Sequence, residues 1–146
     1  MKNYLINEDT IIIFKKGKKT VIVEENQYLE LSIDIMDIIN ESCNYYCSSL
    51  KGRIEGSNYL LGNNYKTPVI ISETREIILF PTSSYRSDDC IWINYKKIDR
   101  YYSKRLNTII EFINGKKITI RLSNKVINKQ ILKSSRLESI LKSKKQ

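Results

Sequence analysis

The three cysteines of the sequence, Cys43, Cys47 and Cys90, are its first candidates for chemistry, because thiolates bind metals and act as nucleophiles. Cys43 and Cys47 have the i, i+4 spacing that places two side chains on one helical face, where Cys90 could join them as a third ligand. Structural zinc normally takes four ligands, and the sequence contains no histidine. Burial as small apolar side chains is therefore the favoured interpretation, and without an export signal the thiols are expected to stay reduced.

A second candidate is the pair Ser48 and Lys51, which has the S-x-x-K spacing of serine acyl-enzymes. The same spacing recurs at Ser139 and Lys142, and the partner motifs S-D-N and K-T-G are absent. The lack of histidine also removes the usual general base of serine and cysteine hydrolases. This pattern is too unspecific to predict an enzyme.

Motifs for nucleotides and metal-dependent nucleases are equally weak. The phosphate-binding patterns G-x-x-x-x-G-K-[ST] and G-x-G-x-x-G do not occur. Asp88 and Asp89 are adjacent acids, but no third carboxylate has a motif relation to them. The sequence therefore predicts a protein with no catalytic activity, no cofactor and no metal.

The whole surplus of positive over negative charge lies in the second part of the chain. The formal net charge is +9; residues 1–85 carry 9 basic and 11 acidic side chains, whereas residues 86–146 carry 16 and 5. Such an asymmetry favours a polyanionic partner over a general drift of composition towards lysine. A membrane surface is the weaker alternative, because residues 123–146 contain no Trp or Phe to anchor a helix in lipid.

The chain is expected to stay in the cytoplasm. No stretch is apolar for the length of a membrane span, and Glu8 and Asp9 interrupt the region in which a signal peptide would need apolar residues.

The first half of the chain predicts a hairpin, then helices, then strands. The β-branched segments 10–14 and 20–23 flank a loop that contains Gly17, which is typical of a hairpin. Apolar spacing predicts a short helix after Ser32, a central helix near 42–56, and strands over 69–72 and 76–80.

The second half predicts strands over 90–95, 108–113 and 117–122, and a basic helix near 124–142 that Ser123 or Asn124 would cap. Asn114-Gly115 suits a type I′ turn between the last two strands. Residues 95–107 fit either a continued strand or a long loop, and residues 143–146 are expected to fray. The fold class is therefore α+β, with one domain over 1–146 that is mostly antiparallel sheet.

Several of these segments resemble one known family. Residues 42–53 read S-C-N-Y-Y-C-S-S-L-K-G-R, close to a block S-C-x-[FY]-[FY]-G-S-S-[YL]-x-G-R, and residues 76–82, 90–93 and 112–116 match its strand, C-x-W-I and F-x-N-G-K segments. Gln130, Lys133 and Leu137 stand where its basic helix has Gln, Arg and Leu. Together these motifs resemble the ComK family of competence transcription factors over roughly residues 40–140.

The resemblance implies a transcription regulator of competence genes that binds double-stranded DNA at A-rich and T-rich boxes. Binding would run largely through the minor groove, with self-association across the boxes and localisation to the nucleoid. No helix-turn-helix pattern is evident, which agrees with reading of groove shape. Cys47 departs from the family's glycine. The chain also ends soon after the basic helix, and the extension of better-known members is linked to the MecA adaptor and ClpC protease, so that control is in doubt here.

Ten basic residues are the predicted DNA contacts, on the motif block and in the positive second part: Lys51, Arg53, Arg86, Lys96, Lys97, Arg121, Lys125, Lys129, Lys133 and Arg136. Lys125, Lys129, Lys133 and Arg136 would form one stripe on the last helix, opposite its apolar face. The alternative hypothesis is a non-catalytic interaction module that modulates a longer regulator of the same type.

Overall fold

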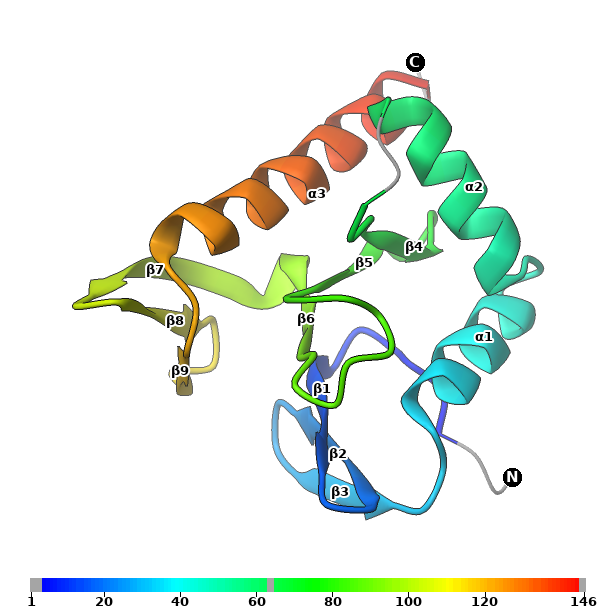
Figure 1. Ribbon diagram of the computed structural model, residues 1–146. Helices are drawn as coiled ribbons and strands as arrows, with labels where there is room; N and C mark the ends of the chain where they lie inside the picture. The colour runs from blue at the N-terminus through cyan, green and yellow to red at the C-terminus, as the bar shows by residue number, and fades with distance from the viewer. Residues whose placement is uncertain (1–3, 63–64, 145–146) are drawn as a thin grey trace.

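Two antiparallel sheets and three α-helices make up the computed structural model of the protein, which describes residues 4–62 and 65–144 (Figure 1). The larger sheet has the strand order β3-β2-β1-β6-β5-β4, and the smaller one has the order β7-β8-β9. The predicted α+β class is confirmed. The bounds are β1 Thr10–Lys16, β2 Lys19–Glu24, β3 Tyr28–Leu31, α1 Ile35–Tyr45, α2 Leu50–Leu61, β4 Val69–Ser72, β5 Ile77–Pro81, β6 Trp92–Asn94, the 3₁₀ turn η1 Tyr95–Lys97, β7 Ile98–Lys104, β8 Asn107–Phe112, β9 Lys117–Ile120 and α3 Asn124–Lys144.

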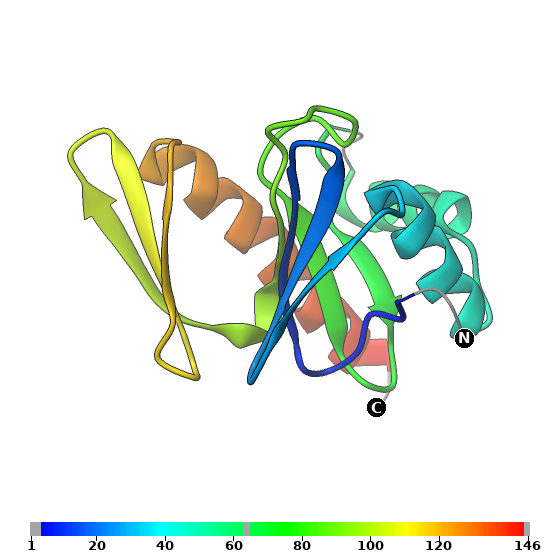
Figure 2. The ribbon, with the colours of Figure 1, turned by 90° about the horizontal axis from the view of Figure 1, so that it is seen from below.

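The six-stranded sheet has a separate core on each face, because successive side chains of a strand point in opposite directions. On β5, Ile77 and Leu79 pack with residues of α1 and α2, whereas Ile78 and Phe80 face α3 and the smaller sheet. Trp92 and Ile93 of β6 divide in the same way. The sheet is thus a middle layer, with α1 and α2 on one side and α3 with β7–β9 on the other (Figures 1 and 2).

The predicted first hairpin is confirmed as β1 and β2. Strand β3, an edge strand of four residues that pairs with β2, was not predicted from the sequence. The helix expected after Ser32 begins at Ile35, and its cap is Asp34, whose carboxylate accepts a hydrogen bond of 3.1 Å from the backbone N–H of Met36.

The single helix expected near 42–56 is instead the end of α1, a break at residues 46–49, and the start of α2. Cys47 has φ +68°, and its N–H donates to the carbonyl of Asn44 while Ser48 N–H donates to that of Cys43, which is a Schellman end. Ser49 then caps α2 through its hydroxyl. The left-handed position explains the family's glycine at residue 47, since glycine adopts positive φ without steric cost.

Residues 95–107, for which the sequence allowed either a continued strand or a long loop, form η1 and then strand β7 of the smaller sheet. The β8–β9 hairpin is confirmed, but its turn is not type I′. Gly115 alone in the turn has positive φ, at +89°, and its N–H donates to the carbonyl of Phe112 at 2.9 Å. This is a three-residue loop in which an ordinary turn is followed by a left-handed glycine.

Helix α3 crosses both sheets and joins them. Its first half packs Ile127 and Ile131 against the core shared with the smaller sheet, and its second half packs Leu137 and Leu141 against β4 and β5. Ser123 caps it, as predicted, because its carbonyl and hydroxyl accept from Val126 N–H. Residues 143 and 144, expected to fray, are helical, and residues 145 and 146 lie outside the described residues. No helix within 4–62 and 65–144 is long and apolar enough to cross a membrane.

Candidate nucleic-acid interface

Four lysines converge around one hollow on the exposed side of α3. Lys125, Lys129 and Lys133 follow one another at i, i+4 and i+8, so they form a row along the helix. The segment before β4 adds Lys66, and the hollow has a volume of about 560 Å³. We call this feature the lysine hollow; its other lining residues are Tyr65, Val126 and Gln130.

Hydrogen bonds hold the segment before β4 against α3. The buried amide of Gln130 donates from Nε2 to the carbonyl oxygens of Lys66 at 2.8 Å and of Pro81 at 2.7 Å. The ammonium of Lys133 donates to the carbonyl of Tyr65 at 2.8 Å. The backbone of Lys66 adopts φ +49°. The position of the fourth lysine therefore depends on tertiary contacts.

Positive charge in the lysine hollow is not neutralised by any residue that the structure describes. No carboxylate lines it, and among residues 4–62 and 65–144 none of its four lysines forms an ion pair. Burial lowers the pKa of Lys133, and repulsion from Lys66 and Lys129 lowers it further. An anion in the hollow would stabilise the charged form of this lysine, so the arrangement is suited to phosphate groups.

Two more predicted residues belong to the same region. Arg121 is exposed and lies between β9 and the start of α3, and Arg136 is exposed on α3 itself. Neither has an ion-pair partner in the described part of the chain. Along the chain they flank the lysine row, with Arg121 before it and Arg136 after it.

Three predicted residues are bound to carboxylates of the protein. Lys97 pairs with Glu25 at 2.7 Å, and Arg53 lies 3.7 Å from Glu73. Lys96 bridges two acids, with Glu76 at 3.2 Å and Glu138 as its closest partner. Their charges are largely offset within the fold.

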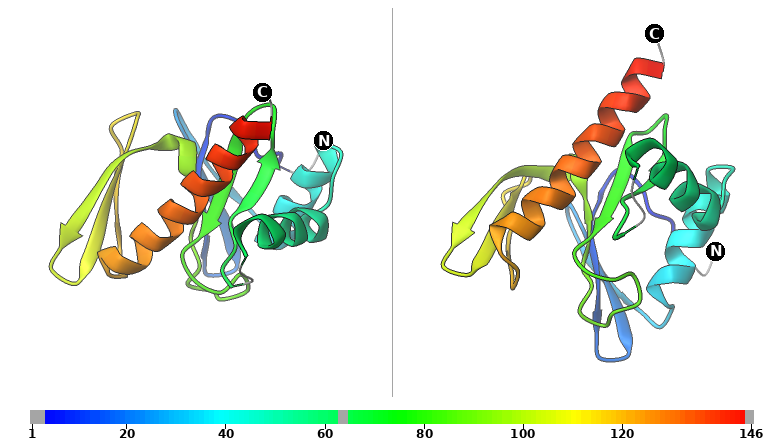
Figure 3. Two further views of the ribbon diagram at one scale, coloured as in Figure 1. Left: turned by 90° about the horizontal axis from the view of Figure 1, so that it is seen from above. Right: turned by 45° about the horizontal axis from the view of Figure 1, so that its top comes forward.

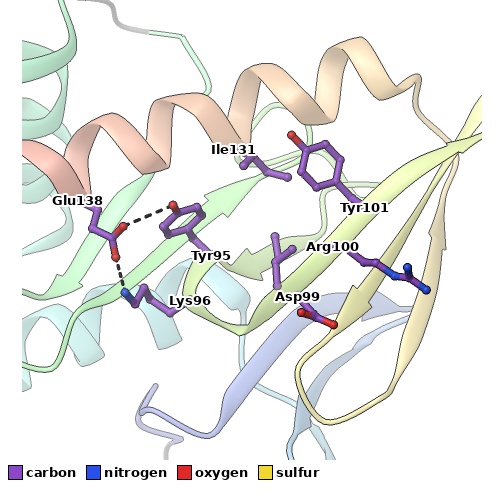
Figure 4. A pocket seen from close by; sticks show the side chains of 8 residues that line it. Tyr95, Lys96, Asp99, Arg100, Tyr101, Ile131 and Glu138 are labelled. Carbon is purple, nitrogen blue, oxygen red and sulfur yellow. Dashed lines mark hydrogen bonds and ion pairs between the residues drawn. The ribbon is translucent and has the colours of Figure 1, made fainter.

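Glu138 makes the hollow between β7 and α3 a mixed-charge site. In Figure 4 its carboxylate accepts hydrogen bonds from Lys96 and from the hydroxyl of Tyr95, at 3.5 Å for the latter. Asp99 and Arg100 line the same space, whose volume is about 490 Å³. This site lacks the net positive charge that a polyanion requires.

Lys51 and Arg86, the remaining predicted contacts, line a third hollow of about 570 Å³ between the helices α1 and α2 and the β5–β6 loop. Asp37 and Glu55 line it as well. The fold thus brings the two cations to one site on the opposite side of the sheet from α3, together with two acids.

The cysteines do not form a site. Cys43 and Cys90 are buried, and burial raises the pKa of both, that of Cys43 to about 11. The expected burial of Cys47 is wrong, because the C-terminal turn of α1 directs this residue to solvent. Within the described residues, no group of three or more His, Cys, Asp or Glu side chains could hold a metal ion.

Lys66 was not among the DNA contacts predicted from the sequence. It is an isolated lysine between Gly62 and Pro68, in a segment predicted as a loop, and it belongs to no basic motif. Gln130 of the family motif anchors the Lys66 segment, but it lies 64 residues away in sequence, so the tertiary structure is needed to connect the two.

Comparison with known proteins identifies one family. The family model described as ComK protein matches residues 1–146. The competence transcription factor of Bacillus subtilis (strain 168) is 24% identical over 144 residues, which cover 95% of this chain and 75% of that protein. A LytTr DNA-binding domain from Bacillus cereus aligns in structure with 12% identity, 85% of this chain, 81% of that chain and a TM-score of 0.42, which is too low to support an inference.

An α+β fold whose last helix carries a row of lysines without ion-pair partners in the described residues is typical of a protein that binds nucleic acid. The chain belongs to the ComK family, because the family model matches its whole length. It is therefore a DNA-binding transcription regulator and not an enzyme.

Proposed function

We propose that the protein regulates competence genes by holding double-stranded DNA against the lysine hollow and the exposed face of α3. The convergence of Lys66, Lys125, Lys129 and Lys133 without a carboxylate supports this most directly. Each lysine that neutralises a phosphate releases condensed counterions, so the four together would supply a strong, salt-dependent attraction.

The helix pair α1 and α2 is the competing surface, since residues 46–49 join two consecutive helices as in a helix-turn-helix. Its charge argues against it. Asp34, Asp37, Glu41 and Glu55 lie on or beside these helices, and Arg53 is paired with Glu73. An acidic surface would repel the DNA backbone, so we place the duplex on α3.

Within this proposal, the protein reads A-rich and T-rich boxes through the minor groove. Narrow minor grooves of A-tracts concentrate negative potential and attract Lys and Arg without base-specific contacts. Lysine lacks the planar guanidinium group with which arginine forms two parallel hydrogen bonds to one base. A row of lysines is therefore suited to recognising the shape and charge of a groove.

A mobility-shift titration of the purified chain tests the function at physiological salt. Three duplexes of equal length are compared: one with an A-rich and a T-rich box, one of mixed sequence, and one in which I·C pairs replace A·T pairs in the boxes. I·C pairs keep the A·T pattern of the minor groove and change the major groove. We expect tight binding to the first and third duplexes. Equal affinity for the mixed duplex would overturn the proposed function, and loss on the I·C duplex would assign reading to the major groove.

Two charge pairs identify the surface. Lys125→Ala with Lys129→Ala removes two charges from the lysine hollow, and Lys51→Ala with Arg86→Ala removes two from the other side of the sheet. The first double variant is expected to weaken binding about 10-fold or more, which corresponds to roughly 1.4 kcal/mol. The second is the matched control and should bind as the unmodified chain does.

Further parts of the proposal concern partners. We propose self-association across paired boxes, which sedimentation with one-box and two-box duplexes would test. Recognition by the MecA adaptor and ClpC protease is tested by whether these two proteins together degrade the purified chain. Nucleoid localisation in the cytoplasm is tested by imaging of a fluorescent fusion.

A further inference from the structure

The β7–β8 hairpin ends in a two-residue turn at Arg105 and Leu106, because Lys104 pairs directly with Asn107. Arg105 has φ +58°, a left-handed conformation that hairpin turns usually assign to Gly, Asn or Asp. Leu106 is 86% exposed. A leucine at the tip and an arginine in a strained position are costly choices for a turn that serves only to reverse the chain.

Leu106 differs from the other exposed aliphatic residues in exposure and surroundings. Ile113 and Leu132 are 56% and 59% exposed, respectively. Around Leu106, no acidic residue occurs between Arg100 and Ile110, and Lys104 and Arg105 adjoin the leucine. The acids of the two strands, Asp99 on β7 and Glu111 on β8, lie at the other end of the hairpin, where Glu111 binds Arg100 and Lys117. The tip is thus apolar at its point and purely basic around it.

The tip lies at the same edge of the molecule as the start of α3, as two views from opposite sides show (Figures 2 and 3). Thr108, beside the tip, pairs with Ile120 of β9, and its hydroxyl donates to the carbonyl of Leu122 at 3.0 Å. Arg121 and then Lys125 follow directly along the chain. Basic residues at the hairpin tip, Arg121 and the start of the lysine row therefore lie along one edge of the molecule.

We propose that the tip of the β7–β8 hairpin enters the minor groove of the bound duplex and that Leu106 wedges between two base pairs. This inference rests on the proposed function. Minor-groove proteins insert Leu and other apolar side chains between base steps and so kink the duplex, with Arg and Lys beside the wedge on the narrow groove. Pyrimidine–purine steps such as TA, which unstack easily, are the favoured places of insertion.

The test uses Leu106→Asn, with Ile113→Asn as the matched control. Ile113 is an exposed aliphatic residue in a turn at the opposite end of the same sheet, so its change to Asn is the control for replacing an exposed aliphatic side chain away from the tip. The probe is the boxed duplex with 2-aminopurine at one adenine at a time, because the fluorescence of this base rises when it is unstacked. We expect the full-length chain and Ile113→Asn to raise fluorescence at one step. Leu106→Asn should give no rise and bind about 10-fold more weakly, as for loss of one buried leucine.

The outcomes separate the two proposals. If the unmodified chain prefers the boxed duplex but Leu106→Asn unstacks it equally, the wedge is refuted and the proposed function stands. If the unmodified chain shows no preference, the proposed function fails first. Sedimentation of the unmodified chain and of Leu106→Asn without DNA tests whether the tip is a protein interface. If the unmodified chain forms an oligomer that Leu106→Asn dissociates, the tip is such an interface and the wedge is refuted. Leu106→Met keeps an apolar tip and should restore the fluorescence signal.

Discussion

The side-chain amide of Gln130 donates a hydrogen bond of 2.8 Å to the carbonyl oxygen of Lys66, across 64 residues of sequence. A second bond, of 2.7 Å, reaches Pro81 at the end of β5. One buried side chain on α3 therefore fixes the segment that carries the fourth lysine of the hollow.

Gln130→Ala is expected to weaken both the fold and DNA binding. The substitution leaves the buried carbonyl of Pro81 without its donor, which costs about 1–3 kcal/mol of unfolding free energy. It also releases the Lys66 segment from α3. Urea denaturation and a mobility shift would measure the two effects. Gln27→Ala, at an exposed glutamine bound to Glu24, is the control and should change neither.

Lys129→Ala combined with Lys133→Ala should flatten the salt dependence of binding. If both lysines contact phosphates, the slope of log K against log salt falls in magnitude by about 1.8, since each contact contributes roughly 0.9. Affinity should drop on boxed and mixed duplexes alike, because phosphate contacts carry no sequence information. An unchanged slope would place the backbone contacts on another surface.

The charge of Lys133 should give DNA binding a dependence on alkaline pH. Burial and the nearby lysines lower its pKa from the ordinary 10.5, so the free protein loses this proton at a lower pH than an ordinary lysine would. As pH rises towards that value, affinity for the boxed duplex should fall earlier for the unmodified chain than for Lys133→Arg, which stays protonated. Parallel pH profiles of the two proteins would contradict a role for this charge.

Only one of the three thiols should react in the native protein. Cys47 is exposed, whereas Cys43 and Cys90 are buried and burial raises the pKa of both thiols. A thiol-reactive dye at neutral pH is expected to label one cysteine rapidly and all three after unfolding. Cys47→Ser should abolish the rapid labelling, and persistence of a fast phase in that variant would contradict the burial of the other two.

The left-handed backbone at Cys47 predicts opposite effects of two substitutions. Cys47→Gly relieves the steric cost of φ +68°, whereas Cys47→Val adds a branched side chain in the same conformation. We expect the glycine variant to unfold at higher urea concentration than the valine variant, with a difference of about 1–2 kcal/mol. Equal midpoints would show that the end of α1 rearranges without cost.

Local sequence patterns predicted the elements whose stabilising contacts are close in the chain. The basic row of α3 follows from the i, i+4 spacing of Lys125, Lys129 and Lys133, and the strands of both main hairpins from their β-branched segments. The break at residues 46–49 was missed, because the periodic apolar positions continue across it while Cys47 turns the chain. The signal for this break was present in residues 42–53, the block that resembles the ComK family, because Cys47 stands where the family has glycine.

The sequence by itself determined that the protein is α+β, that its surplus of positive charge lies after residue 85, and that a basic helix carries four cations on one face. Only the tertiary structure decided which cations remain available for DNA. Lys97 meets Glu25, 72 residues away, whereas Lys133 meets the segment of Lys66 and no acid. The physical reason is that Coulomb interactions depend on distance in space, and the chain path sets this distance for residues far apart in sequence.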